Sequence, residues 1–204
     1  MSIAIIDYDV GNLKNVHTAL KDVQLDSVIT RDPQVMDDAS AIILPGVGAF
    51  ADAMANLNKY HLLEPLKKNV KKGKMLLGIC LGMQILFDES SEDGQHQGLG
   101  FIPGKVTRFD VPGLTVPHMG WNNLVVNRED PIVSGITSED YVYFVHSYYA
   151  VLDHFDSDVV AYAEYALKVP AIVRKDNVIG MQFHPEKSAE TGTRLLRNLK
   201  ECIQ

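Results

Sequence analysis

The sequence predicts an α/β fold with a doubly wound, mostly parallel sheet, and three patterns support this prediction. Short runs of β-branched and other apolar residues alternate with segments of helical periodicity in the first half of the chain. Several of those runs are apolar at every position, as buried parallel strands are. Between about residues 99 and 151 the runs are short and broken by Gly, Pro and Asn, which predicts a partly antiparallel insertion. With 46% hydrophobic residues, the 204-residue chain can form a single domain over residues 1–204.

The individual elements follow from these patterns in order along the chain. The β-branched and apolar runs predict strands at Ser2–Ile6, Asp26–Thr30, Ala41–Leu44, Met75–Ile79, Val159–Tyr162, Ala171–Arg174 and Val178–Phe183. Stripes of apolar residues three and four apart predict helices at Asn12–Leu20, Ala49–Leu57, Leu62–Val70, Leu81–Phe87 and Ala189–Cys202. Ser188 is a plausible N-cap for the last helix. Helices that connect successive parallel strands form right-handed crossovers, so they are expected on both faces of the sheet.

The composition excludes several classes of function. The chain carries 19 Lys and Arg against 26 Asp and Glu, a formal charge of −7, which argues against nucleic acid or an anionic membrane as its main partner. The basic run at Lys67–Lys74 is expected to be a solvated helix end. No apolar run reaches the roughly 18 residues of a transmembrane helix, and the first residues lack the positive region of a secretory signal. The two cysteines form no disulfide or metal-binding pattern, so we expect a cytoplasmic protein without a metal or cofactor.

Cys80 lies in Gly78-Ile79-Cys80-Leu81-Gly82, which has the form of a nucleophile elbow. A nucleophile at the end of a buried strand is held on a sharp, strained turn, and the two glycines keep the turn and the substrate's approach open. The N-terminus of the following helix is expected to favour the thiolate. The N–H of Leu81 is expected to point at the developing oxyanion. The alternative is a structural cysteine between two glycines that pack a helix.

His184 and Glu186 are the candidate general base and its carboxylate partner. Pro185 restricts His184 to an extended conformation, and residues two apart in an extended segment project to the same side. A carboxylate there can accept the imidazole Nδ1–H and leave Nε2 free for the thiol. This is the arrangement of a serine-protease triad with Cys and Glu in place of Ser and Asp. The alternative is a surface His-Pro-Glu turn.

The motifs GICLGMQ (residues 78–84) and QFHPEKS (182–188) resemble those of the class I, triad-type glutamine amidotransferases, and the resemblance spans essentially the whole chain. Further motifs narrow the resemblance to the glutaminase subunits of imidazole glycerol phosphate synthases. These motifs are PGVGAF (45–50), PHMGWN (117–122), YFVHSYY (143–149) and DY-x-x-GN (7–12). One position departs from that pattern, because Asp9 stands where the family usually has a glycine.

The resemblance implies a glutaminase that works with a (β/α)₈-barrel synthase subunit as a heterodimer. Cys80 would hydrolyse glutamine to glutamate and ammonia through a glutamyl thioester. The synthase would use the ammonia to make imidazole glycerol phosphate and aminoimidazole carboxamide ribotide in histidine biosynthesis. The loop after Pro45 is expected to supply an oxyanion donor and to act as a gate, the alternative being a tight turn between a strand and a helix.

The resemblance also implies roles for individual residues. The oxyanion donors would be Leu81, Gly46 and Val47. The substrate-binding residues would be Gln84, His146, Ser147 and Tyr148. The residues facing the synthase would be Asn12, Asn15, Trp121, Tyr143 and Lys187. For Gln84 the alternative is an amide on a helix surface, for Trp121 a core side chain, and for Lys187 an ordinary exposed lysine.

Three other functions remain possible at this stage. The chain could be a glutaminase for another synthase, such as those of anthranilate or pyridoxal phosphate synthesis, although PHMGWN and the HSYY segment argue against this. It could be a non-catalytic binding module of the same fold, although the intact Cys80, His184 and Glu186 argue against that. It could also be a stand-alone cysteine hydrolase. Glutaminase activity measured with and without the barrel synthase distinguishes most of these.

Overall fold

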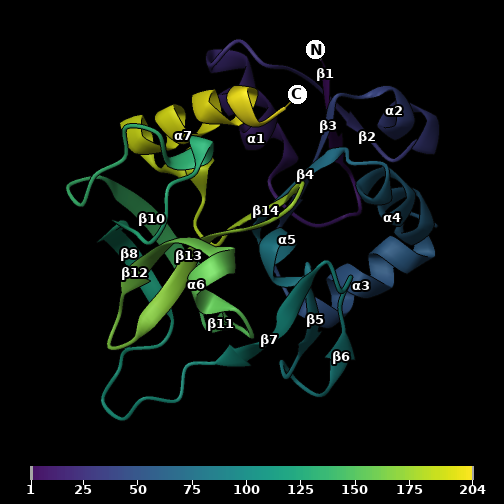
Figure 1. Ribbon diagram of the computed structural model, residues 1–204. Helices are drawn as coiled ribbons and strands as arrows, with labels where there is room; N and C mark the ends of the chain where they lie inside the picture. Colours follow the sequence, from purple (N-terminus) through teal and green to yellow (C-terminus); the bar gives the residue numbers. More distant parts are fainter. Residues whose placement is uncertain (1, 204) are drawn as a thin grey trace.

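The computed structural model describes residues 2–203 and has an eight-stranded sheet at its centre, in the order β2-β1-β3-β4-β14-β13-β12-β9 (Figure 1). The strands are β1 (Ser2–Ile6), β2 (Asp26–Thr30), β3 (Ala41–Gly46), β4 (Met75–Cys80), β9 (Val125–Val126), β12 (Val159–Glu164), β13 (Lys168–Lys175) and β14 (Val178–Met181). The pairings from β2 to β14 are parallel. The pairings from β14 to β9 are antiparallel. The predicted α/β fold with a mostly parallel sheet is therefore confirmed.

Helices cover both faces of this sheet. They are α1 (Leu13–Asp22), α2 (Pro33–Asp38), α3 (Phe50–Lys59), α4 (Leu63–Lys71), α5 (Leu81–Gln84), α6 (Phe155–Asp158) and α7 (Ala189–Cys202), with 3₁₀ turns η1 (Pro131–Val133) and η2 (Pro185–Lys187). Side chains alternate across β1, so Ile5 packs in one core with residues of α1 and α7. Ile6 packs in a second core with residues of α3 and α4. Figure 1 shows α1 and α7 together, apart from α3 and α4.

The middle of the chain forms two smaller sheets, as the predicted insertion requires. One has the order β11-β7-β5-β6, and in the other β8 pairs with β10. Their strands are β5 (Phe87–Ser90), β6 (His96–Gln97), β7 (Ile102–Arg108), β8 (His118–Asn123), β10 (Tyr141–His146) and β11 (Tyr148–Leu152). The pairings are antiparallel except for β5 with β7, which run parallel. Antiparallel pairing also extends beyond the insertion, into the last third of the chain.

The predicted helix Leu81–Phe87 is wrong in its second half. α5 ends at Gln84, and Phe87 begins β5. The carbonyls of residues 85–87 accept hydrogen bonds from the N–H groups of residues 99–102 instead of continuing the helix. Ile85, Leu86 and Phe87 are all fully buried, and a run that is apolar on every side gives no periodicity to mark where a helix stops.

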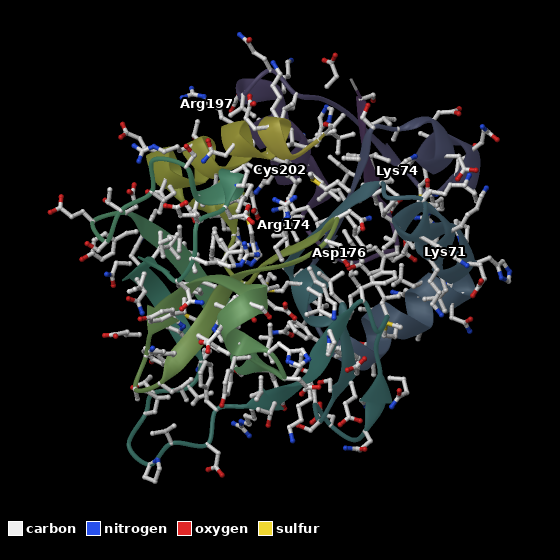
Figure 2. The ribbon with its side chains drawn as sticks, viewed as in Figure 1. Lys71, Lys74, Arg174, Asp176, Arg197 and Cys202 are labelled. Atoms are coloured by element: carbon white, nitrogen blue, oxygen red, sulfur yellow. The ribbon has the colours of Figure 1, made fainter. Side chains whose placement is uncertain are left out.

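Polar contacts hold α7 and α2 at the end of the sheet opposite Cys80. Arg174 on β13 donates to Asp130 Oδ1 at 3.0 Å and to Cys202 Sγ at 3.7 Å, and Figure 2 shows Arg174 and Cys202 close together beneath α7. Lys74 donates to the main-chain carbonyls of Met36 and Asp37, which joins the start of β4 to α2. Both cysteines are free thiols. No helix within residues 2–203 is long and apolar enough to cross a membrane.

Candidate active site

Cys80 ends β4 with a φ of +55° and a ψ of −111°, a strained backbone for a residue with a side chain. Glycine is needed on either side of Cys80 because neighbouring atoms already fill the space that a Cβ would take there. A Cβ on Gly82 would lie 1.7 Å from the Leu44 carbonyl oxygen, and one on Gly78 would lie 2.4 Å from the Gly82 carbonyl oxygen. The two glycines therefore let the turn pack against β3 and against itself, more than they clear a path for substrate.

The helix after Cys80 is shorter than the sequence predicts. α5 spans only Leu81–Gln84, a single turn, so its dipole is small. Leu81 is its first residue, and its N–H follows the nucleophile directly, as an oxyanion donor of an elbow should. Activation of the thiol by this helix stays a prediction, with a small expected contribution, and His184 is the main candidate for the activating group.

His184 and Glu186 form a buried pair beside Cys80. His184 Nδ1 lies 2.8 Å from Glu186 Oε1, and their side chains are only 4% and 2% exposed. His184 has an extended backbone, as Pro185 predicts, but Glu186 lies in the 3₁₀ turn η2 and not in an extended segment. The turn replaces the predicted strand geometry and still brings the carboxylate to Nδ1.

The second ring nitrogen of His184 is free for chemistry. Nε2 is buried and has no hydrogen-bond partner among the described residues. Burial alone would lower the pKa of His184, but interaction with Cys80 and Glu186 raises this pKa to about 9. A histidine held in this way can take a proton from a thiol and keep it as a stable imidazolium.

Cys80 and His184 open into a cavity of about 470 Å³, a volume suited to a small substrate. Its remaining wall is formed by Val47, Gly48, Leu81, Gln84, Glu92, Pro117, Val145, His146, Ser147 and Tyr148. The structure thus brings together the predicted triad, two predicted oxyanion residues and all four predicted substrate-binding residues. No group of three or more His, Cys, Asp or Glu side chains in residues 2–203 is arranged to hold a metal ion.

Gly46 ends β3, the strand beside Cys80, and Val47 begins the loop that follows it. Gly46 pairs with Cys80 in the parallel ladder between β3 and β4. The buried Tyr8 hydroxyl donates to the Pro45 carbonyl at 2.6 Å, which fixes the Pro45–Gly46 peptide. Beyond it the loop is open, because Val47 is 45% exposed and a Cβ on Gly48 would contact nothing within 4 Å. A fixed peptide is thus followed by an open loop, and the gate stays a prediction.

Gln84 occupies the wall of the cavity and not a helix surface. It is 6% exposed, and its Nε2 donates to the Tyr148 carbonyl at 3.0 Å and to Gln182 Oε1 at 3.1 Å. Both amide hydrogens are used by the protein, so only Gln84 Oε1 is left to face the cavity as an acceptor.

Two residues near Cys80 or the cavity, Gln182 and Glu92, were missed from the sequence. Gln182 is fully buried, and its Nε2 lies 3.9 Å from Cys80 Sγ. It belongs to the QFHPEKS motif, two positions before His184, and this spacing was the available signal. Glu92 accepts the Phe50 N–H at 2.7 Å at the start of α3. It lies in a loop, where no periodicity points to it.

Asp9, the position that departs from the family pattern, lies in the left-handed region with a φ of +64°. A glycine adopts this conformation without strain, which explains the family's usual residue. Here the Asp9 carboxylate contacts Arg31, Lys59 and the Tyr60 hydroxyl. The hydrogen bond from Tyr60 and the two cations hold the pKa of Asp9 below its usual value. These contacts join the first loop to the end of α3.

The residues expected to face a partner are exposed or half-buried. Asn12 caps α1 by accepting the Asn15 N–H at 3.3 Å, and both side chains are exposed. Trp121 is 53% exposed and packs edge-on against Tyr143, its neighbour across the β8–β10 pairing. Lys187 is exposed on η2, which contacts both α1 and β10. The structure therefore brings the three segments that carry these residues together.

Hydrogen bonds join β10 directly to the segment that carries His184. The His184 N–H donates to the Tyr143 carbonyl at 3.1 Å, and the Tyr143 N–H donates to Ser188 Oγ at 3.0 Å. The Ser188 hydroxyl donates in turn to the His184 carbonyl at 2.6 Å. Ser188 does occupy the N-cap position of α7, but its hydroxyl makes no capping hydrogen bond. The predicted N-cap position is therefore confirmed, but the capping hydrogen bond is not made because the hydroxyl binds the His184 carbonyl instead.

Comparison with known proteins gives the family. A family model described as glutamine amidotransferase class-I matches residues 4–202. The chain is 48% identical to the imidazole glycerol phosphate synthase subunit HisH of Caldanaerobacter subterraneus subsp. tengcongensis, over 99% of this chain and 98% of that protein. It is 46% identical to the same subunit of Methanothermobacter thermautotrophicus, over 99% of each protein. This chain is a class I glutamine amidotransferase of the HisH family.

As a HisH-family chain it is a glutamine-hydrolysing enzyme, and the predicted resemblance is confirmed. The fold agrees with more distant solved structures. PurLQS from Thermotoga maritima superposes with a TM-score of 0.78 at 20% identity, over 100% of this chain and 99% of that chain. A crystal structure of a glutamine amidotransferase gives 0.77 at 22% identity, over 98% of each chain. The two curated relatives are named as subunits of imidazole glycerol phosphate synthase, which favours this family over glutaminases of anthranilate or pyridoxal phosphate synthesis.

Proposed function

We propose that this chain hydrolyses glutamine at Cys80 and delivers the ammonia to a (β/α)₈-barrel synthase subunit in histidine biosynthesis. The observation that carries the catalytic part is the buried His184. Its Nδ1 is held by Glu186, and its Nε2 lies beside Cys80 without a partner in the described part of the chain. The synthase would convert its substrate to imidazole glycerol phosphate and aminoimidazole carboxamide ribotide. The printed name of the relatives, a subunit of imidazole glycerol phosphate synthase, supports this partner.

The first half of the reaction forms a thioester. His184 Nε2 takes the Cys80 thiol proton, and the sulfur attacks the side-chain amide carbon of glutamine. The developing oxyanion is held by the Leu81 N–H and by a main-chain N–H of the Gly46–Val47 segment. The His184 imidazolium, stabilised by Glu186, gives its proton to the leaving nitrogen. The C–N bond breaks, and ammonia and a glutamyl thioester on Cys80 remain.

The second half regenerates the enzyme. A water molecule attacks the thioester carbonyl while His184 takes one of its protons. The C–S bond then breaks, the proton returns to the sulfur, and glutamate leaves. Gln84 presents its carbonyl oxygen to the cavity, which suits a donor group of glutamine such as its ammonium. His146, Ser147 and Tyr148 complete the proposed binding site.

The partner surface is proposed around Asn12, Asn15, Trp121, Tyr143 and Lys187. Their exposure and the contacts of η2 with α1 and β10 support one continuous contact region. Tyr143 is hydrogen-bonded to the main chain of His184, and Lys187 follows Glu186 directly, so docking there would act one residue from the triad. We also propose that residues 1–204 form one domain, which the continuous sheet supports, and a cytoplasmic location remains a prediction.

Labelling and turnover test the proposal together. A glutamine-analogue diazoketone should modify Cys80 and leave Cys202, the other thiol, unmodified. Cys80→Ala should lower glutamine turnover by about 10⁴-fold or more, whereas the matched variant Cys202→Ala should keep the parent rate. Turnover should rise when the barrel synthase is added. Equal labelling of both thiols would contradict the nucleophile, and turnover indifferent to the synthase would contradict the partner.

A further inference from the structure

Two buried histidines outside the triad lie beside the cavity. His118 on β8 and His146 on β10 face each other across the antiparallel ladder, and they are only 3% and 6% exposed. The His118 ring stacks between Phe144, at 4.5 Å between ring centroids, and Tyr165, at 4.0 Å. A ring clamped on both faces cannot turn, so its two nitrogens keep fixed directions.

The hydrogen bonds of these rings determine where their protons lie. His146 Nδ1 is 2.7 Å from the Tyr148 carbonyl, which can only accept, so Nδ1 carries the proton. In a neutral ring His146 Nε2 is then an acceptor, and it lies 3.1 Å from His118 Nδ1, which must donate. This leaves His118 Nε2 as the acceptor for the Asn122 side-chain amide at 3.3 Å.

The Asn122 amide has only one orientation that satisfies its neighbours. Its Nδ2 also donates to the Glu164 carbonyl at 3.0 Å, and its Oδ1 accepts the Asn123 N–H at 2.9 Å. Asn122 therefore sets the direction of donation in the series of hydrogen bonds that passes through His118 and His146. Burial lowers the pKa of His118 to about 4 and, as the largest effect, that of His146 to about 3, so both rings are neutral at pH 7.

The other end of this series of hydrogen bonds lies near Cys80. The Tyr148 carbonyl accepts from both His146 Nδ1 and Gln84 Nε2. Gln84 Nε2 also donates to Gln182, whose own Nε2 lies 3.9 Å from Cys80 Sγ. Hydrogen bonds thus join β8 to the wall of the glutamine cavity. Donation runs from Asn122 through both histidines to the Tyr148 carbonyl, where it meets the hydrogen bond that Gln84 donates from the other side.

We propose that His118 and Asn122 are positioning residues of the glutamine site, which hold His146 as its Nδ1–H tautomer and thereby fix the Tyr148 carbonyl and the Gln84 amide. This inference rests on the proposed function, in which Gln84 and the segment 146–148 bind glutamine. The two residues touch neither substrate nor Cys80. Their effect is on glutamine recognition and not on the nucleophile.

Nitrogen NMR of the histidine side chains in the intact parent chain tests the inference without any activity measurement. His118 and His146 should both be neutral Nδ1–H tautomers from pH 7 down to pH 5. An Nε2–H tautomer on either ring, or protonation of either ring in that range, would overturn the proposal. Because the readout needs no substrate, it is independent of whether glutamine is hydrolysed at all.

Two isosteric variants of His118 supply the kinetic test. Asparagine places an amide nitrogen near the Nδ1 position and can still donate to His146, whereas glutamine places it near Nε2 and cannot. Both variants lose the ring stacking equally, so stability does not distinguish them. His118→Gln should raise the KM for glutamine roughly tenfold, as the loss of one buried hydrogen bond does, and His118→Asn should stay within about threefold of the parent. Equal effects of the two variants on KM would overturn the proposal.

Asn122→Asp breaks the hydrogen bond between the two histidines. A carboxylate cannot donate to His118 Nε2, so this ring should change to the Nε2–H tautomer and leave two acceptors facing each other at His146. The NMR signal should report this change, and the KM should rise as in His118→Gln. Alkylation of Cys80 by iodoacetamide, which needs no glutamine recognition, should keep the parent rate in all three variants. Slower alkylation in the variants would indicate a general structural defect and contradict a positioning role. Absence of Cys80 alkylation in the parent protein would contradict the proposed nucleophile.

Discussion

Replacing Gly46 with alanine is expected to slow synthase-stimulated glutamine hydrolysis about 100-fold. The added Cβ would lie 2.8 Å from the Tyr8 hydroxyl oxygen, 2.9 Å from the Gly82 nitrogen and 2.9 Å from Leu81 Cβ. Ordinary contacts of a Cβ begin at 3.4 Å, so the strand has to move by about half an ångström. Tyr8 cannot give way easily, because it is fully buried and bound to the Pro45 carbonyl at 2.6 Å.

The expected fall in rate follows from the displacement of the Gly46–Val47 peptide. Loss of one oxyanion donor costs about 3–4 kcal/mol, or roughly 10²–10³ in kcat. A shift of the Gly46–Val47 peptide by half an ångström weakens that donor and leaves the triad in place, which gives the lower end of this range. Overpacking should also lower the free energy of unfolding by about 1–3 kcal/mol.

The assay is glutamate formation by the chain with and without the barrel synthase, together with urea unfolding of the chain alone. Val47→Ala is the matched control, because its side chain is 45% exposed and no backbone clash is introduced. The control should stay within about twofold of the parent rate. If Gly46→Ala unfolds like the parent and keeps a stimulated kcat within about twofold of it, the assignment of this strand to the oxyanion site is wrong.

Two further predictions concern the triad and the partner surface. The pKa of His184 in the folded chain, about 9, lies above its unfolded value of about 6.5, so its stabilisation is complete below pH 6.5 and is lost as the pH rises through about 9. Glu186→Gln should lower this pKa and flatten the fall in unfolding free energy between pH 6.5 and 9, measured by urea titration, and an unchanged pH profile would contradict the pairing. Trp121→Ala should weaken binding of the synthase about 30-fold or more in titration calorimetry, because an exposed aromatic at the centre of an interface contributes about 2 kcal/mol. Its thermal midpoint should stay near the parent's, since Trp121 packs only edge-on against Tyr143, and unchanged affinity would remove it from the interface.

The sequence predicts the features that depend on neighbouring residues. The turn at Cys80 follows from two glycines placed two residues on either side, and the structure shows the close contacts that require them. The pair of His184 and Glu186 follows from a proline between them, although the turn that joins them is 3₁₀ and not extended. The strands of the parallel half follow from short apolar runs, because strands buried on both faces have no polar positions.

The register between strands cannot be read from such local patterns. Gln182 and Cys80 are 102 residues apart, and they meet only because β14 pairs with β4. His118 and His146 are drawn together by the ladder between β8 and β10. The end of α5 depends on N–H groups of residues 99–102 that replace the helix bonds.

By itself the sequence predicted the candidate nucleophile and its base and indicated the family, because these depend on short motifs whose chemistry is local. The tertiary structure decided which polar atoms of each side chain make hydrogen bonds within the protein. Within residues 2–203 it left His184 Nε2 without a partner, used both amide hydrogens of Gln84, and directed the hydrogen bonds of His118 and His146 toward Tyr148. The physical reason is that a buried polar atom must find its partner in space, and that partner comes from a distant part of the chain.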